Sequence, residues 1–399
     1  MTQRHSLPFV VYLLGLTIFT LTTAEFMVAG MMPALSEAFG KSVGEIGYLI
    51  SWYALGMAIG GPILTATLLA LRIPDKRALV WLLGLYVVAS LLAALSTDYA
   101  MLAFTRILMG VASSACIGVS LTICAELVPA NERGRAASIV LGGLMLAPVF
   151  GVPGTALIEQ FFGWRVSFAA ITVLACFCTA IVMARVPASA GPEEVSLADE
   201  FSLLFNRRLW AAYATSGLII GAAITAVSYF APVFTELAGV SPRIVPMLLI
   251  AYGMANVVGN LVVGRFADRY IMPILAFGLL VLALALASFA LFAHHLVPSL
   301  IAFFIVGLTG VSLNPAMAAR VMGTASPRPL VNTMHTSVIT SGIAFGSWIG
   351  GAGIDAGYGL TSPLWIGCIM ASIGLLSVLP FLSRRERTCT AAPCSNVTG

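Results

Sequence analysis

Charged residues are scarce in this sequence. They make up only 9% of its 399 residues, whereas hydrophobic residues make up 60%. No water-soluble fold can bury so large an apolar fraction, because a soluble surface needs many more charged side chains. The composition therefore excludes a soluble globular protein. It favours a chain whose apolar helices are solvated by the hydrocarbon core of a lipid bilayer.

Motifs for several other functions are also missing. The sequence contains no glycine-rich phosphate loop ending in Lys-Ser or Lys-Thr, which argues against ATP-driven transport by this chain alone. It shows no cluster of metal ligands and no nucleophile–base pair, so we expect no metal, no cofactor and no enzymatic activity. The basic residues fall singly or in pairs between apolar runs, which speaks against nucleic acid as a partner.

Apolar runs of about 20 residues, the length that crosses a bilayer, follow one another along the chain. The first, 7–32, is longer than the apolar core of a signal peptide and is interpreted as a retained span. The runs predict twelve membrane-spanning helices with approximate cores at 8–32, 44–66, 78–96, 99–124, 136–158, 166–186, 209–233, 243–263, 272–293, 297–320, 333–354 and 361–382.

The positions of lysine and arginine predict the orientation of these spans, because positively charged loops stay in the cytoplasm. With the amino terminus inside, sixteen of the twenty basic residues fall on inner segments. The outer loops hold only three, Lys41, Arg165 and Arg243, and Arg106 lies inside a span. Both termini are therefore predicted to be cytoplasmic.

A long polar stretch divides the chain into two sets of six spans. We predict an N-terminal six-helix bundle at 1–187, a cytoplasmic linker at 188–208, and a C-terminal six-helix bundle with a short tail at 209–399. The linker segment SLADEFSLLFNRR has apolar residues at helical spacing and predicts a short interfacial helix, with a plain connection as the alternative. In both halves a glycine-rich second span leads into a basic inner loop. Parallel repeats of this kind place a substrate site near the midplane between the halves.

Four stretches of the sequence resemble the major facilitator superfamily, and in particular its twelve-span drug:proton antiporter group. They are TTAEFMVAGMMP at 22–33, RILMGVASSA at 106–115, APVFGVPGTALIEQFFGWRVSF at 147–168 and GRFADR at 264–269. The likeness extends over nearly the whole chain and is greatest to bacterial chloramphenicol-resistance, sugar-efflux and purine-efflux proteins. One inner-loop motif departs from the family pattern, since Leu71 stands where an aspartate is usual and Pro74 where a glycine is usual.

The resemblance implies a secondary transporter in a bacterial-type inner membrane. Its partners would be a small-molecule substrate, protons and the lipid bilayer, with the proton gradient as energy source. A monomer is expected. The resemblance also implies that Pro148, Gly151 and Gly154 shape the wall of the cavity, with ordinary tight helix packing as the alternative. Asp268 and Arg269 would act in gating at an inner loop, or merely set the topology.

Glu25 and Arg106 are the charged residues well inside apolar spans. A carboxylate at that depth is costly unless it is neutral, paired or facing water, so it is a candidate for binding and releasing a proton during transport. Arg106 keeps its charge and must face a polar cavity or a partner. We therefore predict that Glu25 carries the coupled proton and that Arg106 tunes it. The alternatives are a glutamate at the outer rim and an arginine that binds carbonyls at a helix end.

Scattered polar and aromatic residues in the spans suit a roomy pocket for an amphipathic molecule. Each of them is also compatible with a role in helix packing. The candidates for substrate binding are Tyr53, Tyr229, Phe230, Asn256, Asn260, Asn314 and His335.

The leading hypothesis is proton-coupled export of a small amphipathic, drug-like compound by alternating access. Export of an endogenous metabolite, such as a sugar, a purine or a peptide-like product, stays open, because the polar lining does not choose between them. A non-transporting membrane sensor would carry a sizeable extra domain, which the short tail does not offer. A membrane-embedded enzyme would require a catalytic constellation that the sequence does not show.

Overall fold

A computed structural model describes residues 7–129, 132–187, 206–267, 269–324 and 329–382 of the chain. Every regular element in these ranges is a helix. A bilayer imposes this architecture, because a helix satisfies its own backbone hydrogen bonds where no water is present to do so. The structure thus confirms the predicted all-helical membrane fold.

The helices of the first half form six spans and a short helix, α2, between the first two. In chain order they are α1 (Phe9–Gly30), α2 (Met32–Phe39), α3 (Val43–Leu55), η1 (Gly56–Gly60), α4 (Gly61–Ala70), α5 (Asp75–Ala94), α6 (Tyr99–Glu126), α7 (Arg133–Leu146), η2 (Ala147–Gly151), α8 (Val152–Phe162) and α9 (Trp164–Arg185).

The second half repeats this organisation. Its elements are α11 (Arg207–Ser228), α12 (Phe230–Pro232), η3 (Val233–Leu237), η4 (Pro242–Ile244), α13 (Val245–Ala267), α14 (Ile271–Leu291), α15 (Leu296–Thr309), η5 (Val311–Leu313), α16 (Asn314–Thr324), α17 (Pro329–Gly353), η6 (Ile354–Tyr358) and α18 (Ser362–Leu382).

Twelve helical stretches of the described residues are long and apolar enough to cross a membrane, and they coincide with the twelve predicted spans. Some spans combine several elements. The fifth, Arg133–Phe162, contains α7, η2 and α8. Pro148 lies near the start of η2, a π-helical turn, where its missing N–H cannot continue the regular ladder. The interfacial helix predicted in the linker falls almost wholly outside the described residues, and the three-part division of the chain stays a prediction.

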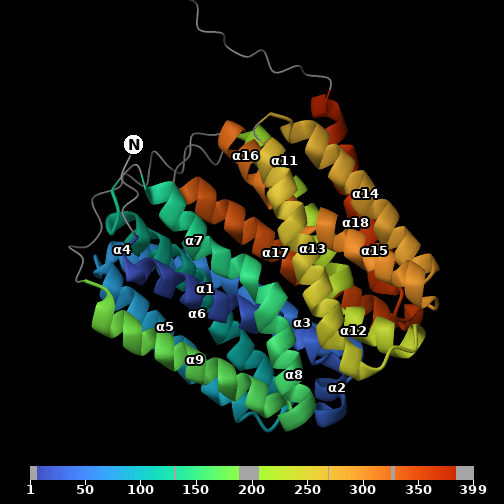
Figure 1. Cartoon of the computed structure of the whole chain (residues 1–399), viewed down its shortest axis with the longest axis horizontal. Coiled ribbons are helices and arrows are strands. Elements are labelled where there is room, and N and C mark those ends of the chain that lie inside the picture. Colours follow the sequence, from blue (N-terminus) through green and yellow to red (C-terminus); the bar gives the residue numbers. More distant parts are fainter. Residues whose placement is uncertain (1–6, 130–131, 188–205, 268, 325–328, 383–399) are drawn as a thin grey trace, which may run out of the picture.

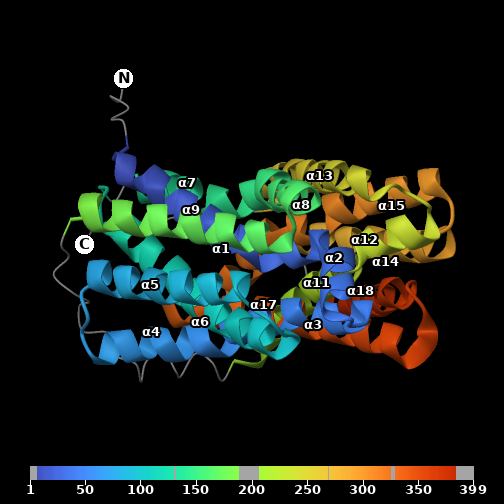
Figure 2. The ribbon, with the colours of Figure 1, turned by 90° about the horizontal axis from the view of Figure 1, so that it is seen from below.

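The two halves of the chain lie side by side. In two perpendicular views the helices of the first half lie mainly on the left and those of the second half mainly on the right, while α2 and α3 extend toward the second half (Figure 1, Figure 2). Between the halves, α3 packs along α17, and α13 packs on η2 and α8. We call the end at which α3 and α13 begin the predicted outer end. The opposite end, at which α1 and α11 begin, is the predicted cytoplasmic end.

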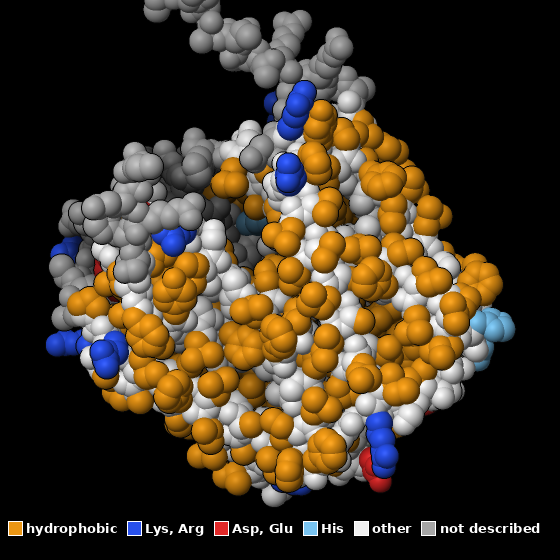
Figure 3. Space-filling model, viewed as in Figure 1, with side chains coloured by type: hydrophobic (Ala, Val, Ile, Leu, Met, Phe, Trp, Pro, Cys, Tyr) orange, Lys and Arg blue, Asp and Glu red, His pale blue; other side chains and the backbone are white. Residues whose placement is uncertain are grey.

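The outer surface matches a lipid environment. Hydrophobic side chains cover most of the face in Figure 3, and Lys and Arg lie mainly at its margins. Trp81 is 75% exposed and Phe161 is 76% exposed. Contiguous apolar surface on this scale is expected where lipid covers the protein. The same face is hollowed between the two halves toward the predicted cytoplasmic end (Figure 3).

Candidate functional site

Glu25 lies on α1 in the interior of the first half. Its side chain is only 5% exposed. Among the described residues, none donates a hydrogen bond to its carboxyl group, and the charged group acting on it is Arg106. A buried carboxyl group without a donor is expensive to keep in an apolar wall. Glu25 therefore has the placement expected of a group that binds and releases a proton.

Arg106 lies on α6 beside Glu25 and is fully buried. Its guanidinium donates to the main-chain oxygens of Ala24 at 2.6 Å, Glu25 at 2.8 Å and Leu49 at 3.2 Å. Carbonyl oxygens have two lone pairs, so they accept these bonds in addition to their helical ones. Arg106 thus ties α6 to both α1 and α3. It binds the backbone of Glu25, not its carboxylate, and keeps a fixed positive charge next to that carboxylate.

Tyr53 completes the arrangement around the arginine. Its ring lies 4.3 Å from the Arg106 guanidinium carbon, a cation–π contact, and its hydroxyl donates to the main-chain oxygen of Leu21 at 3.0 Å. Tyr53 is fully buried. The structure thus brings three predicted site residues together on α1, α3 and α6. It places Tyr53 as a support of Arg106, whereas the sequence suggested an aromatic surface for substrate.

The small residues that follow Arg106 explain how the helices come so close. A side chain at Gly110 would collide with the main-chain oxygen of Tyr53, and one at Gly56 would collide with the main-chain oxygen of Ile107. Glycine at both positions lets the backbones of α3 and η1 touch that of α6. The arginine followed by a small-residue face is therefore a packing device that holds Arg106 in place.

Asn256 and Asn260 lie on α13 in the second half. Asn256 is buried, and its Oδ1 atom has no hydrogen-bond partner among the described residues. Asn256 lies seven residues after Leu249, and Asn260 lies seven residues after Gly253. Seven residues are about two helical turns, so each asparagine lies on the same side of α13 as the earlier residue. A Cβ atom at Gly253 would lie 2.7 Å from the Pro148 backbone, and Leu249 lies close to Gly30. Both asparagines therefore lie on the face of α13 that points toward the first half.

The two aromatic candidates of the second half are packed at the predicted outer end. Tyr229 is fully buried, and its hydroxyl donates to the main-chain oxygen of Ser347 at 2.6 Å. Phe230 stacks on Phe303 with ring centroids 5.2 Å apart. Around Phe303 lies an aromatic cluster, which consists of Phe230, Phe234, Tyr252, Phe289 and Phe303.

The remaining candidates in the second half lie apart from this cluster. His335 is buried, with Nε2 3.0 Å from the Ser216 hydroxyl and its ring stacked on Tyr213 at 5.8 Å. It therefore joins α17 to α11 near the predicted cytoplasmic end. Asn314 is the first residue of α16 and is half-buried. The structure does not bring either residue to the Glu25 region.

The motif residues of the fifth span differ among themselves. A side chain at Gly151 would collide with Thr23 of α1, so this glycine sets a close helix contact. A Cβ atom at Gly154 would meet nothing within 4 Å, so this glycine sets none. At the inner loop of the second half, Asp268 lies outside the described residues, whereas Arg269 is exposed and lies 5.3 Å from the Tyr270 ring centre.

Sequence reasoning missed Asp355 in η6. This residue contacts Ser42 and Tyr48 of the first half, more than 300 positions earlier in the chain. One signal was present, because an aspartate ends a span that is rich in glycine, SGIAFGSWIGGAGIDAGYG. Nothing in the sequence, however, connects that aspartate to its partners.

Sequence comparison relates the whole chain to known proteins. The family model of the Major Facilitator Superfamily matches residues 14–325 and 236–392. The chain is 29% identical over 392 residues to the chloramphenicol resistance protein of Streptomyces lividans, covering 97% of this chain and 99% of that protein. It is also 29% identical over 382 residues to the inner membrane transport protein YdhP of Escherichia coli strain K12, covering 95% and 97%.

A solved structure supports the same fold. The bacterial homologue of the human lysosomal transporter Spinster, in an inward-facing and occupied conformation, is similar with a TM-score of 0.72 over 94% of this chain and 97% of that one. At 16% sequence identity, this likeness concerns the fold. The twelve spans and the bacterial relatives indicate a multi-pass protein of the inner membrane. The chain, a transporter and not an enzyme, belongs to the Major Facilitator Superfamily.

Proposed function

We propose that this transporter exports a small amphipathic compound and that protons flowing inward drive the export. The observation that carries the proposal is Glu25, a buried carboxyl group to which no described residue donates a hydrogen bond. A group in that position gains or loses a proton when the space beside it opens to water. The name of the chloramphenicol resistance protein supports an exported, drug-like substrate.

Arg106 gives the coupling site a fixed geometry. Its three bonds to backbone oxygens and its contact with Tyr53 lie within the first half. They can therefore persist while the two halves rock against each other. The positive charge stays next to Glu25 throughout the cycle, so access to water is what changes. This is how one carboxyl group can exchange protons with each side in turn.

The second half contributes the surface for substrate. Asn256 and Asn260 lie on the face of α13 that points toward the first half, and the buried Oδ1 of Asn256 accepts no hydrogen bond from the described residues. An unpartnered amide oxygen is a suitable anchor for a hydrogen-bond donor on a ligand. If both termini are cytoplasmic, as predicted, the end at which Ser42 and Tyr48 of α3 meet Asp355 is the outer one, and the hollow of Figure 3 opens inward.

The test is transport into proteoliposomes with an acidic lumen. A thermal-shift panel that begins with chloramphenicol supplies the compound, because a ligand that binds the folded state raises Tm. We expect an acidic lumen to drive uptake of this compound in exchange for protons. Glu25→Gln should abolish the effect of the pH gradient while exchange of the compound without a gradient continues.

Glu37→Gln is the matched control, because Glu37 is an exposed residue of α2 at the predicted outer end. It removes the same charge without touching the interior, so gradient-driven uptake should be unchanged. Uptake by Glu25→Gln that still responds to the pH gradient would refute Glu25 as the proton carrier.

A further inference from the structure

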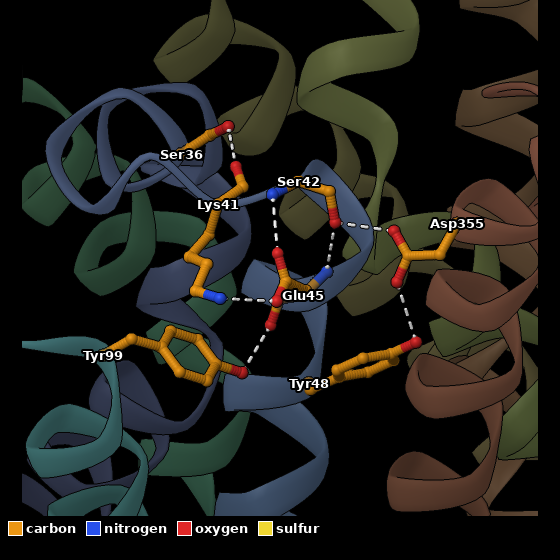
Figure 4. Close-up of polar contacts among 7 residues, drawn as sticks. All are labelled: Ser36, Lys41, Ser42, Glu45, Tyr48, Tyr99 and Asp355. Atoms are coloured by element: carbon orange, nitrogen blue, oxygen red, sulfur yellow. Dashed lines mark hydrogen bonds and ion pairs between the residues drawn. The ribbon is translucent and has the colours of Figure 1, made fainter.

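The predicted outer end of α3 is a rigid platform. Ser42 caps the helix through a hydrogen bond from the Glu45 N–H to its hydroxyl at 3.0 Å, and the Glu45 carboxylate accepts from the Ser42 N–H in return. Lys41 pairs with Glu45 at 2.8 Å, and Tyr99 of α6 donates to the Glu45 main-chain oxygen at 2.6 Å (Figure 4). A capping box of this kind fixes the first turn of a helix. The Ser42 side chain is therefore held in position from within the first half.

Asp355 reaches this platform from the second half. Its Oδ1 accepts a hydrogen bond from the Ser42 hydroxyl at 2.6 Å, and its Oδ2 accepts one from the Tyr48 hydroxyl at 2.9 Å (Figure 4). Both oxygens of one carboxylate are thus used on one helix of the other half. Hydrogen bonds to an ionised group are stronger than bonds between neutral groups.

Glycines lie directly beneath this contact. A Cβ atom at Gly351 would lie 2.7 Å from the main-chain oxygen of Gly44 and 2.6 Å from the Tyr229 hydroxyl. A side chain at Gly47 would collide with Tyr229. The Ser347 hydroxyl also donates to the Gly47 main-chain oxygen at 3.0 Å. The backbones of α3 and α17 therefore approach closely at Gly44 and Gly351, and Gly47 leaves room for the Tyr229 hydroxyl between the two helices.

We propose that Asp355 is a gating residue of the transporter. Its two hydrogen bonds to α3, together with the glycine contact between α3 and α17, keep the predicted outer end closed. Both bonds join one half to the other, so they must break each time this end opens. The inference rests on the proposed alternating-access function for its biological meaning, whereas the closure itself can be measured without substrate.

The test measures two distances by double electron–electron resonance on the full chain in lipid nanodiscs. Spin labels at Glu37 and Arg243 report the predicted outer end, and labels at Arg77 and Met322 report the predicted cytoplasmic end, in a background with its native cysteines replaced. Asp355→Ala, and separately Ser42→Ala with Tyr48→Phe, should raise the ratio of outer-open to outer-closed molecules roughly tenfold. The outer distance should lengthen as the cytoplasmic distance shortens.

Gly351→Ala should have the same effect by wedging α3 and α17 apart. Its control is Gly84→Ala in α5, where a new Cβ atom would meet nothing within 4 Å. If Gly351→Ala does not fold, the paired Ser42 and Tyr48 substitutions still test the proposal, because they remove only surface hydroxyls. Unchanged distances in both hydroxyl-deleted and Asp355→Ala protein would overturn it. If the outer end opens as expected but the wild-type protein shows no pH-driven transport, the proposed coupling is refuted and the proposal that Asp355 is a gating residue still holds.

Discussion

The two halves of the molecule have the same number of spans but bury different chemistry. The first half holds a buried carboxyl group, Glu25, and a fully buried arginine, Arg106, in adjacent helices. The second half holds an aromatic cluster around Phe303, with neutral polar side chains such as Asn256 and His335. Its own buried arginine, Arg320, lies near the end of α16 and not within the span interior.

The difference suggests a division of labour between the halves. The three hydrogen bonds of Arg106 have fixed directions, which makes its surroundings rigid. Aromatic and aliphatic contacts have weaker directional demands, so they accept ligands of different shape. We therefore interpret the first half as the coupling half and the second half as the one that adapts to substrate.

The largest expected effect concerns the two buried arginines. Arg106→Ala removes three bonds to backbone oxygens and the contact with Tyr53, and should lower the free energy of unfolding by about 3–5 kcal/mol. Arg320→Ala should change it by less than about 1 kcal/mol. Nη1 of Arg320 has no hydrogen-bond partner among the described residues, and its guanidinium carbon lies 5.2 Å from the Phe381 ring centre. Thermal unfolding in detergent measures both losses.

Arg106→Lys sharpens this comparison. Lysine keeps the charge but has no planar group that reaches three carbonyl oxygens. The free energy of unfolding of Arg106→Lys should therefore lie between those of wild type and Arg106→Ala. If Arg106→Ala and Arg320→Ala lose the same free energy of unfolding, Arg106 does not make the first half more rigid than the second.

An intermediate effect is expected at Asn256. Asn256→Ala removes the unpartnered amide oxygen on the face of α13 that points toward the first half. It should raise the KM for the transported compound about 5- to 10-fold, which corresponds to one hydrogen bond. The dependence of transport on the pH gradient should not change, because coupling is assigned to the other half.

Met254→Ala is the control for this substitution. Met254 lies on the same helix but is 48% exposed, so it faces away from the other half. Its KM should equal that of wild type. A weaker response to the pH gradient in Asn256→Ala would mean that the second half takes part in coupling.

Much of the fold follows from the sequence alone, because a bilayer leaves few alternatives. Apolar runs of spanning length can be satisfied only by helices, and each of the predicted spans is found. Glu25 and Arg106 were recognisable for the same reason, since a charge inside a span is costly. What the sequence left undetermined is which atoms Arg106 binds: backbone oxygens on two other helices, including that of Glu25 itself.

Contacts between the halves could not be predicted in this way. Ser42 and Asp355 are 313 positions apart, and neither lies in the four stretches that resemble the family. The sequence suggests that Tyr229 is an aromatic side chain available to substrate, but the structure places its hydroxyl on Ser347, next to Gly47 of the first half. Such roles depend on contacts between helices that are distant in the sequence, and a single sequence does not show which helices are in contact.

The smallest effect is expected at His335. This residue tests most directly whether proton coupling is confined to the first half. Histidine is the side chain most often used as a proton carrier near neutral pH, and His335 is a buried histidine of the second half. Its Nε2 meets the Ser216 hydroxyl and its ring stacks on Tyr213, so we interpret it as a packing residue. His335→Phe keeps the stacked ring and loses one hydrogen bond, while Ser216 still donates to the main-chain oxygen of Ala212. We expect a loss of about 1 kcal/mol in unfolding free energy and an unchanged pH profile of transport. A displaced pH profile, measured in the same proteoliposomes as Glu25→Gln, would place a second proton carrier in the half assigned to substrate.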